Sequence, residues 1–291
     1  MKKSNLKLVA YVLLAFWVGY EINDSRVASI GRFIEQNFFK KPDIVTARQS
    51  NARVFVDVSN RREVACPSAR KAIVIIGFGQ SNSANQAGHR FEQSGSNVVN
   101  FFDGKCYIAI DPMLGAAGSG GSVWIPFAEA LTDKTVVLIT FGVGSTRVSQ
   151  WLDSNDLLPF YEENVRKIKS AYPNPDMAVW IQGESDVTTK PRLFEQQLTH
   201  WIERVKSDFQ KTRLYLTGTS YCQGRSSANI VNSQKLVSRK FGATFIGVTD
   251  TIKEVKHRYD DCHFSERGIE KLVSLLVKGI SKPVGRRPAV N

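Results

Sequence analysis

Ser81 lies where a serine can act as a nucleophile. It belongs to the sequence GFGQSN at residues 77–82, directly after the apolar run AIVII at residues 72–76. A short β-branched run that ends in glycine predicts a buried strand, and open α/β sheets hold their active sites at the carboxyl ends of such strands. The hydroxyl of Ser81 is therefore a candidate nucleophile.

His263, in the sequence DDCHFSERG at residues 260–268, is a candidate base for this serine. A serine hydroxyl is a weak nucleophile until a neighbouring base takes its proton, and the base needs a third group that holds its tautomer. Asp260 stands three residues before His263, so on a tight loop its carboxylate can accept from one ring nitrogen while the other faces the serine. Asp261 is the alternative partner, and the spacing favours Asp260.

Other motifs do not fit the glycine-rich segment. A dinucleotide-binding fingerprint needs a third glycine, and Asn82 stands in its place. The G-x-S-x-G elbow of α/β-hydrolases needs a glycine where Ser83 stands. The sequence also contains no CxxC and no HExxH pattern, so we expect neither a metal nor a cofactor.

The segment WIQGESD at residues 180–186 completes a set of three motifs. The GQSN, WxQGE and DxxH blocks follow one another within about residues 70–280. They resemble the motifs of the SGNH hydrolases, in particular the sialate O-acetylesterase and acetylxylan esterase branch. The resemblance implies a catalytic triad of Ser81, Asp260 and His263 on a flavodoxin-like three-layer fold.

The resemblance also implies three donors to the oxyanion of a tetrahedral intermediate. They are the backbone N–H of Ser81, that of Gly144 in the turn GVGST at residues 142–146, and the side-chain amide of Gln182. Each such donor contributes about 3–4 kcal/mol to transition-state stabilisation. Ser145 departs from the branch, which has a second glycine at this position, and the second donor therefore stays open.

Five further residues could contact a substrate. Asn82 follows the nucleophile, and Glu184 of the WxQGE block could act as a second acid or brace its loop as a buried carboxylate. Arg147 follows the oxyanion turn and could hold a substrate carboxylate by two hydrogen bonds, or could simply be solvated. Trp124 and Trp151 could form a wall on which a sugar stacks, although core aromatics are the commoner case.

Apolar runs alternate with helical patterns along the chain, which predicts βαβ units and a parallel sheet. We expect a three-layer α/β fold with five parallel strands at residues 72–77, 135–142, 177–181, 214–219 and 244–248. Four helices are expected at residues 158–171, 191–209, 226–241 and 265–280. Residues 83–134 interrupt the alternation with a long glycine-rich excursion, a feature that is more often functional than idle.

Residues 1–25 have the pattern of an export signal. Three lysines precede an apolar stretch at residues 8–20, which suits a signal-peptide core but is short for a membrane span of about 20 residues. No convincing cleavage site follows, so we expect a signal anchor or a signal peptide, with a buried amphipathic helix as the alternative. The lysines predict an exported domain, either anchored in the inner membrane and facing the periplasm or secreted.

Positive charge is concentrated outside the expected catalytic domain. Of the formal net charge of +12, residues 1–71 carry about +7 and residues 282–291 about +3. We therefore expect a basic connector at residues 26–70, an SGNH hydrolase domain at residues 71–281 and a basic tail at residues 282–291. The near-neutral domain gives no reason to expect nucleic acid as a partner. The connector could lie against anionic lipid or polymer, or be a solvated linker.

Four cysteines in an exported chain can pair in three ways. We prefer Cys66 with Cys106 and Cys222 with Cys262. Cys222 ends a predicted strand at the sheet edge where the DxxH block, which contains Cys262, is expected. Free buried thiols are the alternative.

The motifs and the resemblance together imply a serine esterase that removes O-acetyl groups from a carbohydrate or polysaccharide through an acyl-enzyme. A carbohydrate O-acetyltransferase with the same triad is the alternative, since the acyl group can pass to a sugar hydroxyl when water is excluded. A catalytically silent glycan-binding module is a further alternative, and the intact triad argues against it.

Overall fold

The computed structural model describes residues 44–46, 53–92, 95 and 97–281. All of them belong to one compact unit that begins at Asp43. The expected leader, most of the expected connector and the basic tail lie outside the described residues. Within the described part of the chain, no helix has both the length and the apolar character needed to cross a membrane.

Five parallel strands form the centre of the sheet, and they are the five that the sequence predicts. They are β4 (Ile73–Gly79), β7 (Val136–Thr140), β8 (Met177–Ile181), β9 (Arg213–Gly218) and β10 (Thr244–Val248). Their order across the sheet is β10-β9-β8-β4-β7, and every neighbouring pair is parallel. Counted in chain order this is 2-1-3-4-5, the flavodoxin-like order that places a site at the carboxyl edge beside the first strand.

The sheet is larger than the expected five strands and is mixed. It continues through β5 (Val98–Phe102), which is parallel to β7, to β6 (Lys105–Ile108) and β3 (Glu63–Val64), which are antiparallel to their neighbours. A separate antiparallel pair consists of β1 (Ile44–Thr46) and β2 (Arg53–Phe55). The β5–β6 hairpin turns at Asp103 and Gly104, both with positive φ, which is a tight-turn signal that the sequence prediction passed over.

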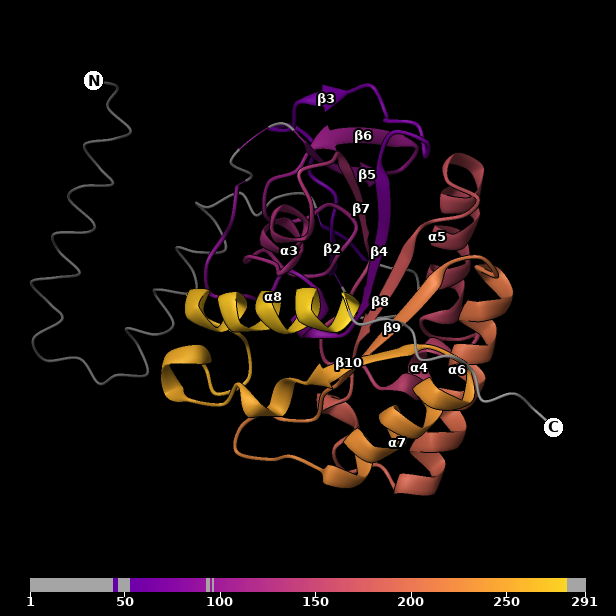
Figure 1. Cartoon of the computed structure of the whole chain (residues 1–291), viewed down its shortest axis with the longest axis vertical. Helices are drawn as coiled ribbons and strands as arrows, with labels where there is room; N and C mark the ends of the chain where they lie inside the picture. Colours follow the sequence, from indigo (N-terminus) through magenta and orange to yellow (C-terminus); the bar gives the residue numbers. More distant parts are fainter. Residues whose placement is uncertain (1–43, 47–52, 93–94, 96, 282–291) are drawn as a thin grey trace, which may run out of the picture. The chain divides into compact units, whose positions relative to one another are not determined.

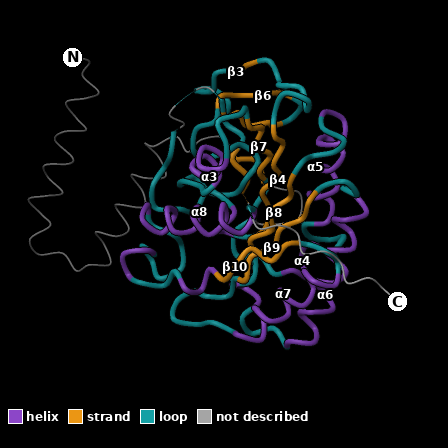
Figure 2. Tube along the Cα trace, viewed as in Figure 1, coloured by secondary structure: helices purple, strands orange, loops and turns teal. Residues whose placement is uncertain are grey.

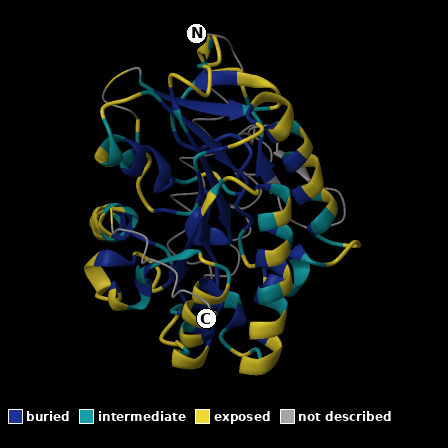
Figure 3. Cartoon of the chain, turned by 45° about the vertical axis from the view of Figure 1, so that its right-hand side comes forward, coloured by how far each residue is buried: buried dark blue, intermediate teal, exposed yellow. Residues whose placement is uncertain are grey.

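Helices cover both faces of the sheet, as Figures 1 and 2 show. One face carries α4 (Val148–Trp151), α5 (Leu158–Ala171), α6 (Pro191–Asp208) and α7 (Ala228–Lys240), and the other carries α3 (Trp124–Leu131) and α8 (Glu266–Ile280). The four predicted helices are confirmed, and α3 and α4 are additional. The strands are buried between the two layers while the helices expose their outer sides (Figure 3).

Local sequence explains where these helices begin. Pro191 occupies the first turn of α6, where its missing N–H costs nothing. Ser227 and Ser265 cap α7 and α8, and their side chains accept from backbone N–H groups in the first turn.

Residues 53–70 pack onto the domain, although the sequence suggested a connector there. Phe55 exchanges backbone hydrogen bonds with the loop at Gly115 and Ala116, and β3 extends the sheet. The disulfide between Cys66 and Cys106 fastens the segment before β4 to β6.

The glycine-rich excursion folds back onto the loop that follows Ser81. The side chain of Asn85 donates to the carbonyls of Met113 and Ala116 at 2.9 and 3.0 Å. A Cβ atom on Gly121 would lie 1.5 Å from the carbonyl oxygen of His89. Glycine is required at position 121 because the two backbone segments are in contact there. The glycine-rich excursion therefore packs against the loop that follows Ser81.

The two disulfides, both in the pairing that the sequence favours, each join cysteines 40 residues apart. Because the loops are equally long, the chain-entropy model predicts the same stabilisation for each, at most about 4 kcal/mol. We expect Cys66→Ala/Cys106→Ala and Cys222→Ala/Cys262→Ala each to lower the free energy of unfolding by similar amounts up to this value. Denaturant unfolding of the full chain measures both, and non-reducing peptide mapping checks the pairing. Four free thiols in protein from its native compartment would contradict the prediction.

Candidate active site

The nucleophile segment begins where β4 ends at Gly79. This glycine has a φ of +128°, and a Cβ atom there would lie 2.1 Å from the carbonyl oxygen of Ile181 on β8. The tight contact lets the N–H of Gln80 donate to that oxygen at 3.0 Å. Ser81 then starts a short 3₁₀ helix (Ser81–Ser83) and is 5% exposed, at the carboxyl edge of the sheet.

The base segment is the loop before α8. The Nδ1 atom of His263 lies 2.6 Å from Oδ2 of Asp260, whose Oδ1 accepts from the backbone N–H groups of Cys262 and His263. Burial alone would raise the pKa of Asp260, but the hydrogen bonds from His263 and Cys262 outweigh it and hold that pKa below its usual value. Asp261 turns away and accepts from the hydroxyl of Tyr221 at 2.5 Å. Asp260 is therefore the partner of the imidazole.

Several contacts bring the base segment against the nucleophile segment. The side chain of Asn82 donates to the carbonyl of Cys262 at 3.4 Å, and the N–H of Gly88 donates to the carbonyl of Phe264 at 2.9 Å. No hydrogen bond joins Ser81 to His263, both of which the structure describes. Catalytic hydrogen bonds are often long in free enzymes and shorten when substrate binds.

Gly144 lies beside Ser81. A Cβ atom built on this glycine would be 3.5 Å from Cβ of Ser81, so the turn after β7 touches the nucleophile. Ser145, which replaces the second glycine of the branch, has a φ of +60°, the conformation that normally favours glycine. Although serine replaces glycine at position 145, the backbone there keeps the left-handed conformation that glycine usually adopts. Among the described residues, the N–H groups of Ser81 and Gly144 have no protein acceptor.

Gln182 is fully buried, and its amide nitrogen faces three protein oxygens. These are the carbonyl of Thr146 at 2.5 Å, Oδ2 of Asp186 at 3.1 Å and Oε1 of Gln80 at 3.2 Å. An amide nitrogen carries two protons, so in this arrangement both point to the protein. Gln182, expected as the third oxyanion donor, therefore connects the segment after β8 with the end of β4 and with the turn after β7.

Asn82 and Glu184 are joined to each other rather than open to solvent. The amide of Asn82 donates to Oε1 of Glu184 at 2.6 Å, and both side chains are buried. Burial raises the pKa of Glu184 to about 7, and the hydrogen bond from Asn82 offsets this only in part. Of the two roles considered for Glu184, the geometry matches the buried brace.

Arg147 is exposed at the end of the turn after β7, and its Nε donates to the carbonyl of Ser185 at 3.1 Å. Trp124 and Trp151 do not form a sugar-stacking wall. Both are 0% exposed, Trp124 donates its indole N–H to the carbonyl of Ser83, and Trp151 packs against other core aromatics. Their large apolar surfaces fill the two cores, and that prediction is corrected.

Arg258 is a positioning residue that the sequence prediction missed. It is 2% exposed, and its guanidinium donates to the carbonyls of Ile252, Thr249 and Cys262. The group lies 4.2 Å from the ring centre of Phe264. Its place two residues before the DxxH block was the available signal, but an arginine in a loop is usually solvated.

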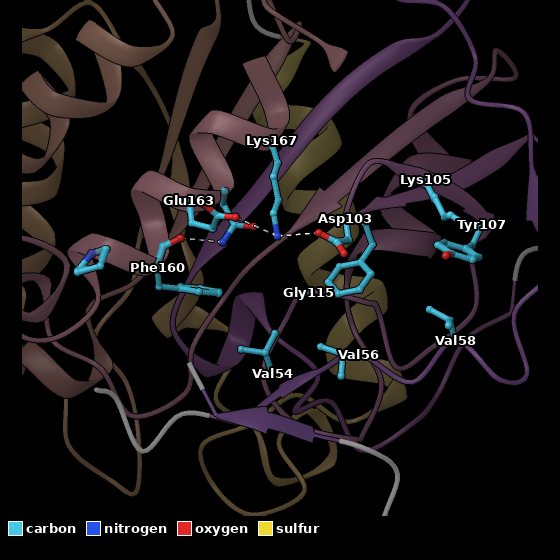
Figure 4. Close-up of a pocket in the computed structure, with 13 residues that line it drawn as sticks. Val54, Val56, Val58, Asp103, Lys105, Tyr107, Gly115, Phe160, Glu163 and Lys167 are labelled. Carbon is cyan, nitrogen blue, oxygen red and sulfur yellow. Dashed lines mark hydrogen bonds and ion pairs between the residues drawn. The ribbon is translucent and has the colours of Figure 1, made fainter. Parts of the chain in front are cut away.

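A cavity of about 940 Å³ is lined by residues other than the predicted catalytic ones (Figure 4). Val54, Val56 and Val58 line one side, while Lys167 reaches between Asp103 at 2.7 Å and Glu163 at 3.3 Å. None of its lining residues belongs to the three motif blocks. Chemistry rather than cavity size therefore identifies the candidate site.

A serine, a hydrogen-bonded histidine–aspartate pair and a neighbouring glycine turn lie at the carboxyl edge of a 2-1-3-4-5 sheet, which is the arrangement expected from the resemblance to the SGNH hydrolases. A family model described as "Carbohydrate esterase, sialic acid-specific acetylesterase" matches residues 71–282. The chain belongs to this carbohydrate esterase family.

Solved structures share the fold. A protein of Arabidopsis thaliana has a TM-score of 0.56 at 15% identity, covering 73% of this chain and 99% of its own. A putative GDSL-like lipase from Parabacteroides merdae has a TM-score of 0.50 at 16% identity, covering 72% of this chain and 97% of its own. Comparison with curated protein sequences gave no significant match.

The buried carboxyl of Glu184 should make stability depend on pH. Its pKa is about 7 in the folded chain against an ordinary 4.5, so the folded state holds the proton longer and stability falls as pH rises from about 4.5 to about 7. We expect Glu184→Gln to remove up to about 3 kcal/mol of this decline. Denaturant unfolding at pH 5 and pH 8 measures it, with Glu195→Gln on the exposed side of α6 as the control. Parallel pH profiles for the wild type and Glu184→Gln would contradict the prediction.

Proposed function

We propose that the protein is a serine esterase that removes O-acetyl groups from a carbohydrate through an acyl-enzyme. The oxygen of Ser81 attacks the acetyl carbonyl while His263 takes its proton, and His263 then returns the proton to the sugar oxygen as the ester bond breaks. Water then attacks the carbonyl carbon of the acetyl-serine while His263 takes its proton. The bond from this carbon to the serine oxygen breaks, His263 returns the proton to Ser81, and acetate is released.

The hydrogen bond between Asp260 and His263 carries this proposal. With Nδ1 held by the carboxylate at 2.6 Å, Nε2 is the nitrogen left to exchange a proton with the serine and the leaving group. The carboxylate also favours the imidazolium that forms during the reaction. Family membership supports an ester of a carbohydrate as the substrate.

Two backbone donors serve the oxyanion in this proposal, the N–H groups of Ser81 and Gly144. They lie on adjacent segments, and neither has an acceptor among the described residues. Gln182 acts as a positioning residue that holds the turn after β7 through Thr146. Arg147, exposed beside that turn, is proposed to contact the substrate.

The place of action is also part of the proposal. Two disulfides indicate an oxidising compartment outside the cytosol. The lysines and apolar stretch of residues 1–25 support a signal anchor in the inner membrane, or a signal peptide, that delivers residues 71–281 to the periplasm or beyond.

The first test is acetate release from acetylated polysaccharides by the full chain. Ser81→Ala should lower the rate by about 10³-fold or more, because the nucleophile is lost while its neighbours stay in place. Enzymatic assay of acetate measures the loss, and circular dichroism checks the fold. A folded variant that keeps more than a tenth of the rate would show that Ser81 is not the nucleophile. Transfer of acetyl to a second sugar without acetate release would indicate a transferase.

Adjacent aspartates provide a matched pair for the triad. Asp260→Asn should lower kcat by about 10³–10⁴-fold, since the amide cannot hold the required tautomer of His263. Asp261→Asn should cost less than tenfold, because the carboxylate accepts from Tyr221 rather than from His263 and asparagine tolerates positive φ. Equal losses in the two variants would contradict the assignment of Asp260.

A further inference from the structure

A second cavity, of about 520 Å³, lies where the nucleophile and base segments meet. It is lined by residues on both segments: Ala87, Gly88, His89, Tyr259, Ser265 and Glu266. Its volume is within the range of about 300–1,000 Å³ found for small-molecule sites. None of these residues is one of the predicted catalytic or substrate-binding residues.

Tyr259 is held beside His263 with its ring open to solvent. The two rings are stacked, with centres 6.1 Å apart and planes 29° apart. The hydroxyl of Tyr259 donates to the carbonyl of Gln86 at 3.2 Å, and the ring lies so close to Gly88 that a Cβ there would be 2.7 Å from it. The residue is nevertheless 54% exposed. A fixed, exposed aromatic ring is suited to pack against the apolar C–H face of a sugar.

Polar groups also line this cavity. Nε2 of His89 lies 3.7 Å from Oε1 of Glu266, and both side chains are about half exposed. An imidazole and a carboxylate side by side can donate to and accept from neighbouring hydroxyls. Among the described residues, the lining contains one carboxylate and neither lysine nor arginine, so its charge disfavours an acidic sugar.

The chemistry of ester cleavage determines which part of a substrate lies here. His263 must reach the leaving oxygen to protonate it, so the alcohol part of the ester lies on the histidine side of the scissile bond. Tyr259 stacks on that histidine and lines the cavity. The cavity therefore adjoins the position of the leaving sugar.

We propose that this cavity is the subsite for the leaving sugar and that it takes an uncharged pyranose, with Tyr259 as the stacking platform and His89 and Glu266 as partners of its hydroxyls. The proposal rests on the proposed function for its place in the reaction. Binding of the free sugar is independent of turnover and tests the subsite by itself.

The binding experiment titrates the full chain with neutral trisaccharides (xylotriose, mannotriose and chitotriose) and with N-acetylneuraminic acid, observed by saturation-transfer NMR and calorimetry. At least one neutral trisaccharide should bind, about tenfold more weakly to Tyr259→Ala and within about twofold of wild type to Tyr259→Phe, because stacking survives in phenylalanine. Val255→Ala, at a 91% exposed apolar residue outside the lining, is the control. Glu266→Gln should raise the relative affinity for the acidic sugar.

A kinetic arm separates the subsite from support of the catalytic histidine. Tyr259→Ala should lower kcat/KM for the acetylated form of the bound trisaccharide about tenfold more than for trifluoroethyl acetate, which has no ring to stack. Equal losses on both esters, binding that is unaffected by Tyr259→Ala, or binding of the acidic sugar alone would overturn the proposal. Sugar binding without acetate release from any sugar ester would instead count against the proposed esterase function and leave the subsite supported.

Discussion

The side-chain amide of Asn82 joins all three motif blocks at one point. It belongs to the first block, donates to Glu184 of the second at 2.6 Å and reaches the carbonyl of Cys262 in the third at 3.4 Å. Ser81 precedes it directly, and His263 directly follows Cys262. Because the amide is buried, leaving either of its protons without a partner would be costly. A shift of any one segment would therefore break the junction that places nucleophile beside base.

Several contacts fix Cys262, the residue immediately before His263. The carbonyl of Cys262 accepts from Asn82 and from the buried guanidinium of Arg258, while its sulfur is tied to Cys222. Asp260 fixes the backbone N–H groups on the other side. Such support matters because an imidazole that acts as a base must keep both its position and its tautomer.

Two charged side chains, those of Glu184 and Arg258, are buried beside Asn82. Glu184 is buried and accepts from Asn82 through one oxygen, while its other oxygen has no partner among the described residues. Its raised pKa follows from that environment. The positive charge of Arg258 lowers the pKa of Glu184, but by less than burial raises it. Asn82 and Glu184 thus contribute rigidity beside Ser81. In the proposed function, more exposed residues such as Arg147 and Tyr259 contact the substrate.

Sequence patterns located the elements that repeat regularly and missed those that depend on contacts. The five central strands and four long helices follow from apolar periodicity, which is a local property. The β5–β6 hairpin and α3 lie within the glycine-rich excursion at residues 83–134, and α4 is only four residues long. Such short apolar stretches show little periodicity. Trp124 and Trp151 were ambiguous for a related reason, since an aromatic side chain is equally suited to a core and to a sugar surface.

The sequence by itself identified the residues proposed as nucleophile, base and orienting acid, their order along the chain, and the layered fold that collects them at one edge of the sheet. Tertiary structure alone decided that the amide of Gln182 braces the turn after β7, that Arg258 is buried and that Tyr259 stands beside His263. The reason is distance along the chain. Asn82 meets partners 102 and 180 residues away, and no local pattern states which of the many possible partners a polar side chain will find when the core closes.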